Sequence, residues 1–160
     1  MNKYISKAKK IIRGNIYMTI ATSSKNGTPW ISPVFFAHDD DYNLFWVSAK
    51  DSLHSKLISK NSQVAIVIFD SSAPEGESDG IYFEAIASEL GDKKEIEHAM
   101  KILNKRVTID DFRVKRIGEV SEDGAWRIYK ASPVKVSKLT SGEFVNGQYV
   151  DKRVDINLRG

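Results

Sequence analysis

Hydroxyl and cationic side chains gather between two apolar segments of the chain, at residues 48–56. Residues 44–48 have the pattern of a β-strand, and residues 52–60 suit a short helix. The first turn of a helix leaves backbone N–H groups unpaired and carries about half a positive charge. Hydroxyls, lysines and an imidazole beside it are suited to bind an anion, most plausibly a phosphate. The side chains concerned are Ser48, Lys50, Ser52, His54, Ser55 and Lys56.

No other catalytic or metal-binding pattern of similar clarity occurs in the sequence. A nucleophile elbow, a P-loop, a dinucleotide fingerprint and a carboxylate pair with acid–base spacing are all absent. His38, His54 and His98 are too widely spaced for a metal motif, and the acidic run 39–41 lacks the glycine and glutamate of a calcium loop. We therefore expect no metal site. If the chain is an enzyme, a bound cofactor carries the chemistry.

The composition is that of an ordinary globular domain. The 160 residues are 41% hydrophobic and 28% charged, which suits a single domain spanning residues 1–160. The net charge is +3 and the basic residues are interleaved with acids, so we expect no nucleic-acid partner. Cysteine is absent, which excludes disulfides and thiolate ligands. Neither a signal-peptide core nor a membrane-spanning run occurs, so we expect a cytoplasmic protein without membrane association.

Changes in hydrophobic period divide the chain into helices and strands. Helices are expected at 2–13, 52–60 and 92–105, with a short helix or turn within 109–117. Strands are expected at 16–22, 29–37, 44–48, 64–69, 81–90, 126–129, 134–139 and, less regularly, 148–158. Asn26-Gly27 indicates a hairpin, the apolar run 64–69 predicts a strand buried on both faces, and Ser132-Pro133 predicts a break between two strands.

Together these elements predict a mainly β protein. Six or seven mostly antiparallel strands with about three short helices on the outside suggest a small closed or nearly closed β-barrel.

The order and spacing of the segments resemble the pyridoxamine 5'-phosphate oxidase-like family, the FMN-binding split β-barrels. The matching segments are WISPVFF (30–36), NLFWVSAKDSLHSKLI (43–58), NSQVAIVIFDS (61–71), GIYFEAIASEL (80–90) and WRIYKASPVKVSKL (126–139). The resemblance implies a homodimer with FMN at the subunit interface. It also implies that the phosphate binds near the turn after the third strand, and that the second strand's backbone runs along the flavin ring.

Carried over residue by residue, the resemblance implies two sets of cofactor contacts. Ser48, Lys50, His54, Ser55 and Lys56 fall where the family contacts the FMN phosphate and ribityl chain. The backbone of Trp30, Ile31, Ser32, Pro33 and Val34 falls along the isoalloxazine, and Trp126 lies near a position from which the partner subunit approaches the flavin. Apart from the resemblance, Lys50 and Lys56 are better explained as solvated lysines at a helix start, His54 is equally consistent with an exposed helical position, and the tryptophans are ordinary barrel core.

The sequence departs from the family in two places. The phosphate turn offers lysines and a histidine where the family often has arginine, and lysine lacks the bidentate fork of arginine. The C-terminal RVDINLRG matches poorly the basic ending with which the true oxidases hold the vitamin phosphate. The second departure argues against pyridoxamine phosphate as the substrate.

Three functions are compatible with this sequence. The leading hypothesis is an FMN-dependent oxidoreductase acting on an unidentified small molecule, with a hydride passing to the flavin N5. Because no acid–base set is evident, the alternative is a non-catalytic flavin- or haem-binding protein for storage or sensing, since some relatives bind haem on the same barrel. A deazaflavin-dependent reductase is the third, and the phosphate turn alone does not distinguish it from the first.

Overall fold

The structure is a computed structural model in which residues 3–77 and 79–159 are described. The described residues form three α-helices, eight β-strands and two short 3-10 helices. The helices are α1 (Lys3–Gly14), α2 (Leu53–Ile58) and α3 (Lys93–Arg106), with the 3-10 turns η1 (Asp110–Phe112) and η2 (Ile117–Glu119). The strands are β1 (Tyr17–Ser23), β2 (Pro29–Phe35), β3 (Ala37–His38), β4 (Leu44–Ala49), β5 (Gln63–Phe69), β6 (Gly80–Glu89), β7 (Trp126–Val145) and β8 (Gln148–Asp155).

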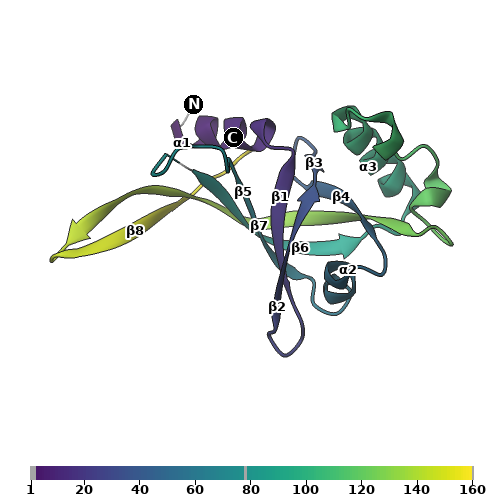
Figure 1. The fold of residues 1–160 in the computed structure, drawn as a ribbon, viewed down its shortest axis with the longest axis horizontal. Helices are drawn as coiled ribbons and strands as arrows, with labels where there is room; N and C mark the ends of the chain where they lie inside the picture. The colour runs from purple at the N-terminus through teal and green to yellow at the C-terminus, as the bar shows by residue number, and fades with distance from the viewer. Residues whose placement is uncertain (1–2, 78, 160) are drawn as a thin grey trace.

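All eight strands belong to one antiparallel sheet. Its order is β2-β1-β5-β6-β7-β4-β3, and β8 pairs with β7. The sheet curls so that β2 also contacts β4, yet these two strands are not hydrogen-bonded to each other. The barrel is therefore open along a seam between β2 and β4, which confirms the mainly β class and the split barrel (Figure 1).

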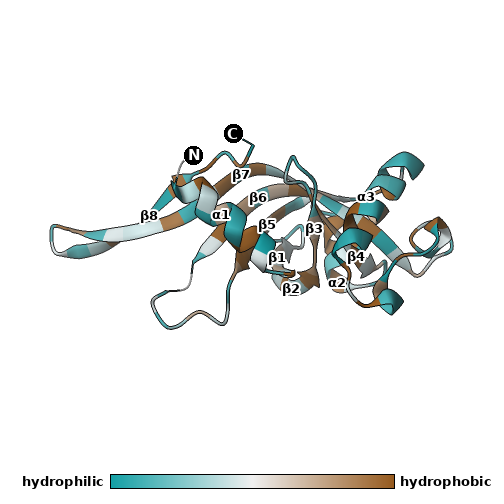
Figure 2. Ribbon diagram, turned by 90° about the horizontal axis from the view of Figure 1, so that it is seen from above, coloured by the Kyte–Doolittle hydropathy of each residue, from teal (hydrophilic) through white to brown (hydrophobic). Residues whose placement is uncertain are grey.

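The concave face of the sheet encloses the main core. Helix α1 contributes Ile5, Ala8 and Ile12 to it, and Trp46 and Tyr129 stack there with ring centroids 5.5 Å apart. A second core lies on the opposite face, where α3 packs its stripe of Ile96, Ala99 and Leu103 onto β4 and β7. Figure 2, seen from above, shows α1 and α3 over different ends of the sheet.

The face of β5 that points away from the main core is uncovered. Val64, Ile66 and Ile68 are buried, whereas Ala65 and Phe69 are exposed and Val67 is half-buried. The prediction that residues 64–69 are buried on both faces is therefore wrong for the single chain. The sequence pattern is apolar on both faces, but only one of them is packed against this chain's own core.

The predicted break at Ser132-Pro133 is also wrong. Strand β7 runs without interruption from Trp126 to Val145 and pairs with β6 along half its length. Pro133 faces Ala85 at a register shift between Glu84 and Ala85. At such a bulge one residue forms no backbone hydrogen bond to the neighbouring strand, so proline, which has no N–H, can occupy that position. The described residues form eight strands rather than six or seven, because the expected strand 29–37 divides into β2 and the two-residue β3, the segments 126–129 and 134–139 join in β7, and the less regular segment 148–158 forms β8.

Beyond the barrel, β7 and β8 continue as a two-stranded ribbon that projects from the body (Figure 1). None of the helices in the described part of the chain has the length and apolar character needed to cross a bilayer.

Candidate functional site

The predicted phosphate turn has the expected strand–turn–helix form. Strand β4 ends at Ala49 and α2 begins at Leu53, with Ser52 as its N-cap. The Ser52 Oγ accepts a hydrogen bond from the Ser55 backbone N–H at 3.4 Å, which satisfies one unpaired donor of the helix start. The backbone N–H of Lys50 donates to the Ala125 carbonyl at 3.1 Å and thereby ties the turn to the start of β7.

The hydroxyls of this turn point inward and surround His54. The His54 Nε2 lies 2.8 Å from the Ser48 Oγ and 3.2 Å from the Ser52 Oγ. Ser48 and Ser55 are buried, with 6% and 3% of their surface exposed. Burial lowers the pKa of His54. The polar groups predicted at this turn are thus brought together, but Ser48 and Ser55 lie beneath its surface.

The two lysines of the turn are on the surface. Lys50 and Lys56 are both exposed, and neither forms an ion pair with another described residue. Their ammonium groups are the uncompensated charges at this place. The surface of the turn is therefore cationic, while its interior is made of neutral hydroxyls and an imidazole.

Strand β2 is an edge strand whose residues alternate between two environments. Trp30, Ser32 and Val34 face the barrel interior, since their partners on β1 are buried or point there. Ile31 and Pro33 point to the outer face, where both are exposed. The five predicted residues therefore form no single side-chain surface. What they share is a backbone edge that pairs with β1 on one side and faces the seam on the other.

The seam brings Trp126 close to the turn. Trp126 lies opposite Ala49 in the β4–β7 ladder, and α2 packs against β1 and β2. The turn therefore lies beside Trp126 at the end of β4 and, through α2, beside β1 and β2, and β2 also contacts β4. Trp30 and Trp126 are 47% and 52% exposed as whole residues, so neither is ordinary core.

A polar chain that sequence inspection missed extends from the turn into the barrel wall. Ser52 Oγ donates to Ser55 Oγ at 2.8 Å, and Ser55 in turn hydrogen-bonds the Tyr129 phenol. The Tyr129 hydroxyl donates weakly to the Glu89 carboxylate at 3.5 Å. Burial raises the pKa of Tyr129, and the Ser55 bond acts in the opposite direction. These residues come from α2, β7 and β6, so no local spacing could have indicated the connection.

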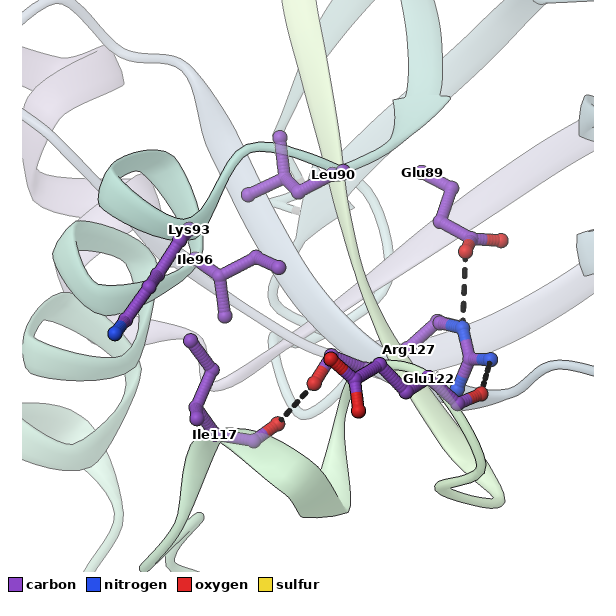
Figure 3. A pocket seen from close by; sticks show the side chains of 9 residues that line it. Glu89, Leu90, Lys93, Ile96, Ile117, Glu122 and Arg127 are labelled. Carbon is purple, nitrogen blue, oxygen red and sulfur yellow. Dashed lines mark hydrogen bonds and ion pairs between the residues drawn. The ribbon is translucent and has the colours of Figure 1, made fainter.

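Glu89, at the far end of these hydrogen-bonded side chains, borders a hollow of about 360 Å³ (Figure 3). Its wall contains Glu89 and Arg127, and the Arg127 Nε lies 2.9 Å from the Glu89 Oε1. The other Arg127 nitrogens donate to the carbonyls of Gly124, Trp126 and Glu122, so its hydrogen bonds are used within the chain. None of the predicted site residues lines this hollow, nor a smaller one of about 290 Å³ beside His98. The candidate site is an open surface at the seam.

Sequence comparison identifies the family. The family model of pyridoxamine 5'-phosphate oxidase matches residues 5–137, most of the barrel. The chain belongs to this family. No protein with a curated function matches the sequence.

Solved structures similar to this member of the pyridoxamine 5'-phosphate oxidase family include heme proteins and a FAD-binding protein. The heme storage protein HutZ of Vibrio cholerae is 17% identical, with a TM-score of 0.65, and the match covers 80% of this chain and 88% of that one. A heme binding protein of Mycobacterium smegmatis is 15% identical, with a TM-score of 0.71 and coverages of 97% and 59%. A FAD-binding protein of Mesorhizobium loti is 17% identical, with a TM-score of 0.61 and coverages of 86% and 94%. At such identities the likeness establishes the fold.

Proposed function

We propose that this chain is a homodimeric flavoprotein that binds FMN between its subunits and acts as an oxidoreductase on a small molecule. The observation that carries the proposal is the grouping of two unpaired lysines, Lys50 and Lys56, with the open edge of β2 at one seam. Membership of the pyridoxamine 5'-phosphate oxidase family and the FAD-binding structural neighbour support a flavin.

The exposed part of the turn fits a phosphate group. Lys56 lies in the last turn of the six-residue helix α2 and Lys50 precedes the helix, and because both are exposed they can approach one dianion from different sides. Ser48 and Ser55 are buried beneath the turn, so we assign them to shaping it rather than to contacting the phosphate. Charge-assisted contacts of this kind each contribute about 1.5–3 kcal/mol when partly buried.

The edge of β2 fits the polar rim of a flavin ring. An edge strand carries N–H and C=O groups that no neighbouring strand uses, and these can pair with ring nitrogens and oxygens. The half-exposed indoles of Trp30 and Trp126 provide flat apolar surfaces beside that edge and would exclude water from it. When bound, FMN would supply hydride transfer.

The uncovered outer face of the sheet fits a second copy of the chain. Ile31, Ala21 and Ala65 form one row across β2, β1 and β5, in a face that α3 leaves open. A parallel row carries Pro33, Thr19, Val67 and Tyr82. Small and apolar side chains in rows make a flat surface suited to a two-fold contact, and two-fold dimers are the commonest oligomers. A partner there would also bury the second apolar face of β5.

Two affinities test the phosphate assignment. Replacing Lys56 by alanine should weaken FMN binding by about one to two orders of magnitude. Riboflavin, which lacks the phosphate, should lose much less. Lys60→Ala is the matched control, because Lys60 is an exposed lysine just beyond the other end of α2. Equal losses for FMN and riboflavin would remove Lys56 from the phosphate site, and no flavin uptake by the wild-type protein would refute the proposed function.

A haem-binding role is the second candidate, because two of the structural neighbours above are described as heme proteins. His38 is the histidine best arranged for it. Its Nδ1 lies 2.8 Å from the Asp39 carbonyl oxygen and must donate to it, which leaves Nε2 with a free lone pair. On reconstitution, a Soret band that shifts in His38→Ala and not in His98→Ala, without flavin uptake, would favour this role. A deazaflavin would instead be recognised by the fluorescence of the bound ligand.

A further inference from the structure

The imidazole of His54 contacts the first of several hydroxyl groups that are hydrogen-bonded one to the next. The Ser52 hydroxyl donates its single hydrogen to Ser55, whose hydroxyl bonds the phenol of Tyr129, and the series ends on a carboxylate of Glu89 that can only accept. With its hydrogen committed, the Ser52 oxygen can only accept from His54.

This arrangement engages one nitrogen of the His54 ring. The Nε2 lies 3.2 Å from the Ser52 Oγ and 2.8 Å from the Ser48 Oγ, and the Ser48 hydroxyl can accept from a protonated Nε2 or donate to an unprotonated one. When the ring is protonated, both nitrogens carry hydrogen, and Nε2–H donates to the serine oxygens. Among the described residues, Nδ1 has no hydrogen-bond partner. The neutral ring carries no net charge toward an anion, whereas the protonated ring attracts it.

We propose that binding of a phosphate group at the 48–56 turn is coupled to the uptake of one proton by His54. The proton comes from solvent, and in the charged ring Nε2–H donates to Ser48 and Ser52 while Nδ1–H is available to the anion. His54 is then a positioning residue for the turn and a source of pH dependence in cofactor retention. The inference rests on the proposed function, since it requires that the turn holds the FMN phosphate.

Apart from a bound anion, the charged groups near His54 have little influence on its pKa, because they are exposed to solvent or already paired. Lys50, Asp51 and Lys56 on its own turn are exposed to solvent. Strands β1 and β2, which pack against α2, carry no charged residue. On β7, Tyr129 is reached only through Ser55, and Arg127 is engaged by Glu89 of β6.

Protonation of His54 and binding of the phosphate are thermodynamically linked, which gives the direction in which affinity changes with pH. In the free protein burial lowers the pKa of His54, so the ring is neutral near neutral pH. A phosphate dianion within about 4–6 Å raises that pKa. Between the two pKa values the affinity for the phosphate increases as the pH falls, by at most about tenfold per pH unit for one proton. Above both values the coupling vanishes.

The test compares the wild-type protein with His54→Gln, which keeps an N–H donor toward Ser48 and Ser52 but does not titrate. FMN and riboflavin affinities are measured for both from about pH 8 to pH 6, a range that brackets the ordinary histidine pKa. Protonation of the FMN phosphate itself affects both proteins equally, so the ratio of their affinities isolates His54. We expect the wild-type advantage for FMN to grow at least about threefold as the pH falls, and the riboflavin ratio to stay constant.

A constant FMN ratio, or an equal trend with riboflavin, would overturn the coupling and leave the flavin site intact. Absence of FMN uptake by the wild-type protein at every pH would refute the proposed function and the coupling together. The ring of His54 is also titrated by NMR in the wild-type protein, a measurement that does not require His54→Gln to fold. Its pKa should rise on addition of FMN and not on addition of riboflavin, and an unchanged pKa would overturn the proposal.

Discussion

Replacing Asp79 by asparagine tests the most deeply placed ion pair of the fold. Asp79 precedes β6, and its carboxylate contacts the ammonium groups of Lys138 on β7 and of Lys7 on α1, the latter at 2.8 Å. The side chain of Lys138 is only 5% exposed and that of Asp79 only 12%. Burial alone would raise the pKa of Asp79, but the two lysines outweigh it and the pKa lies below its usual value.

The loss of stability expected for Asp79→Asn depends on how deeply the Asp79–Lys138 ion pair is buried. Removing one partner of a buried ion pair costs about 3–5 kcal/mol, because the other charge stays buried without compensation. The Lys138 ammonium keeps one bond, to the Leu139 carbonyl at 2.9 Å, and Asp79 is not fully enclosed. We therefore expect Asp79→Asn to lower the free energy of unfolding by about 2–3 kcal/mol at neutral pH.

The assay is urea unfolding of the wild type and the variant at several pH values. Since the pKa of the Asp79 carboxyl is lowered by folding, its stabilisation is present above the unfolded pKa and is lost as the pH falls through the folded value. The difference between the two proteins should therefore shrink below about pH 4. Asp155→Asn is the control, because Asp155 pairs with Lys135 at 3.4 Å on the surface and should contribute less than about 1 kcal/mol. Equal losses in both variants, or a loss independent of pH, would show that the Asp79 carboxylate is not a stabilising partner of Lys138 and Lys7.

Three further predictions concern the outer face, the turn and α1. Ala65→Glu places a charge in the uncovered row of β5 and should convert dimers to monomers without unfolding, as light scattering and circular dichroism would show; Ile109→Glu, at an exposed apolar residue outside that face, should leave the dimer intact. Ser52→Ala removes the N-cap of α2 and should lower the free energy of unfolding by about 1 kcal/mol in urea titrations. Arg106→Met removes the guanidinium bonds to the carbonyls of Ile12 and Asn15, and should lower that free energy by about 1–3 kcal/mol while retaining the packing on the ring of Phe36.

Local signals in the sequence predicted much of the fold. The Asn26-Gly27 hairpin is present, with Gly27 at a φ of +86° that glycine adopts without strain. Helix α3 begins after Asp92, whose carboxylate accepts from the Glu95 N–H at 3.0 Å, and its apolar stripe is buried. Such features depend on neighbours within a few residues, so spacing and residue type are enough to predict them.

Other features depend on partners that are distant in the sequence. Whether β7 breaks at Pro133 is decided by a bulge opposite β6, more than forty residues earlier in the chain. The inward orientation of Ser48 and the bond between Ser55 and Tyr129 arise only once β4, α2 and β7 are assembled. The sequence could therefore indicate that the turn is polar, and only the three-dimensional structure separates its buried hydroxyls from its exposed lysines.

The most direct test of the account is to add FMN to the purified protein, remove free flavin, and record mass and flavin absorbance together by light scattering during gel filtration. An FMN site between two subunits predicts a single species with the mass of two chains that carries one FMN per chain. A monomer that retains flavin would contradict the interfacial site, and a dimer that retains none would contradict the flavin itself.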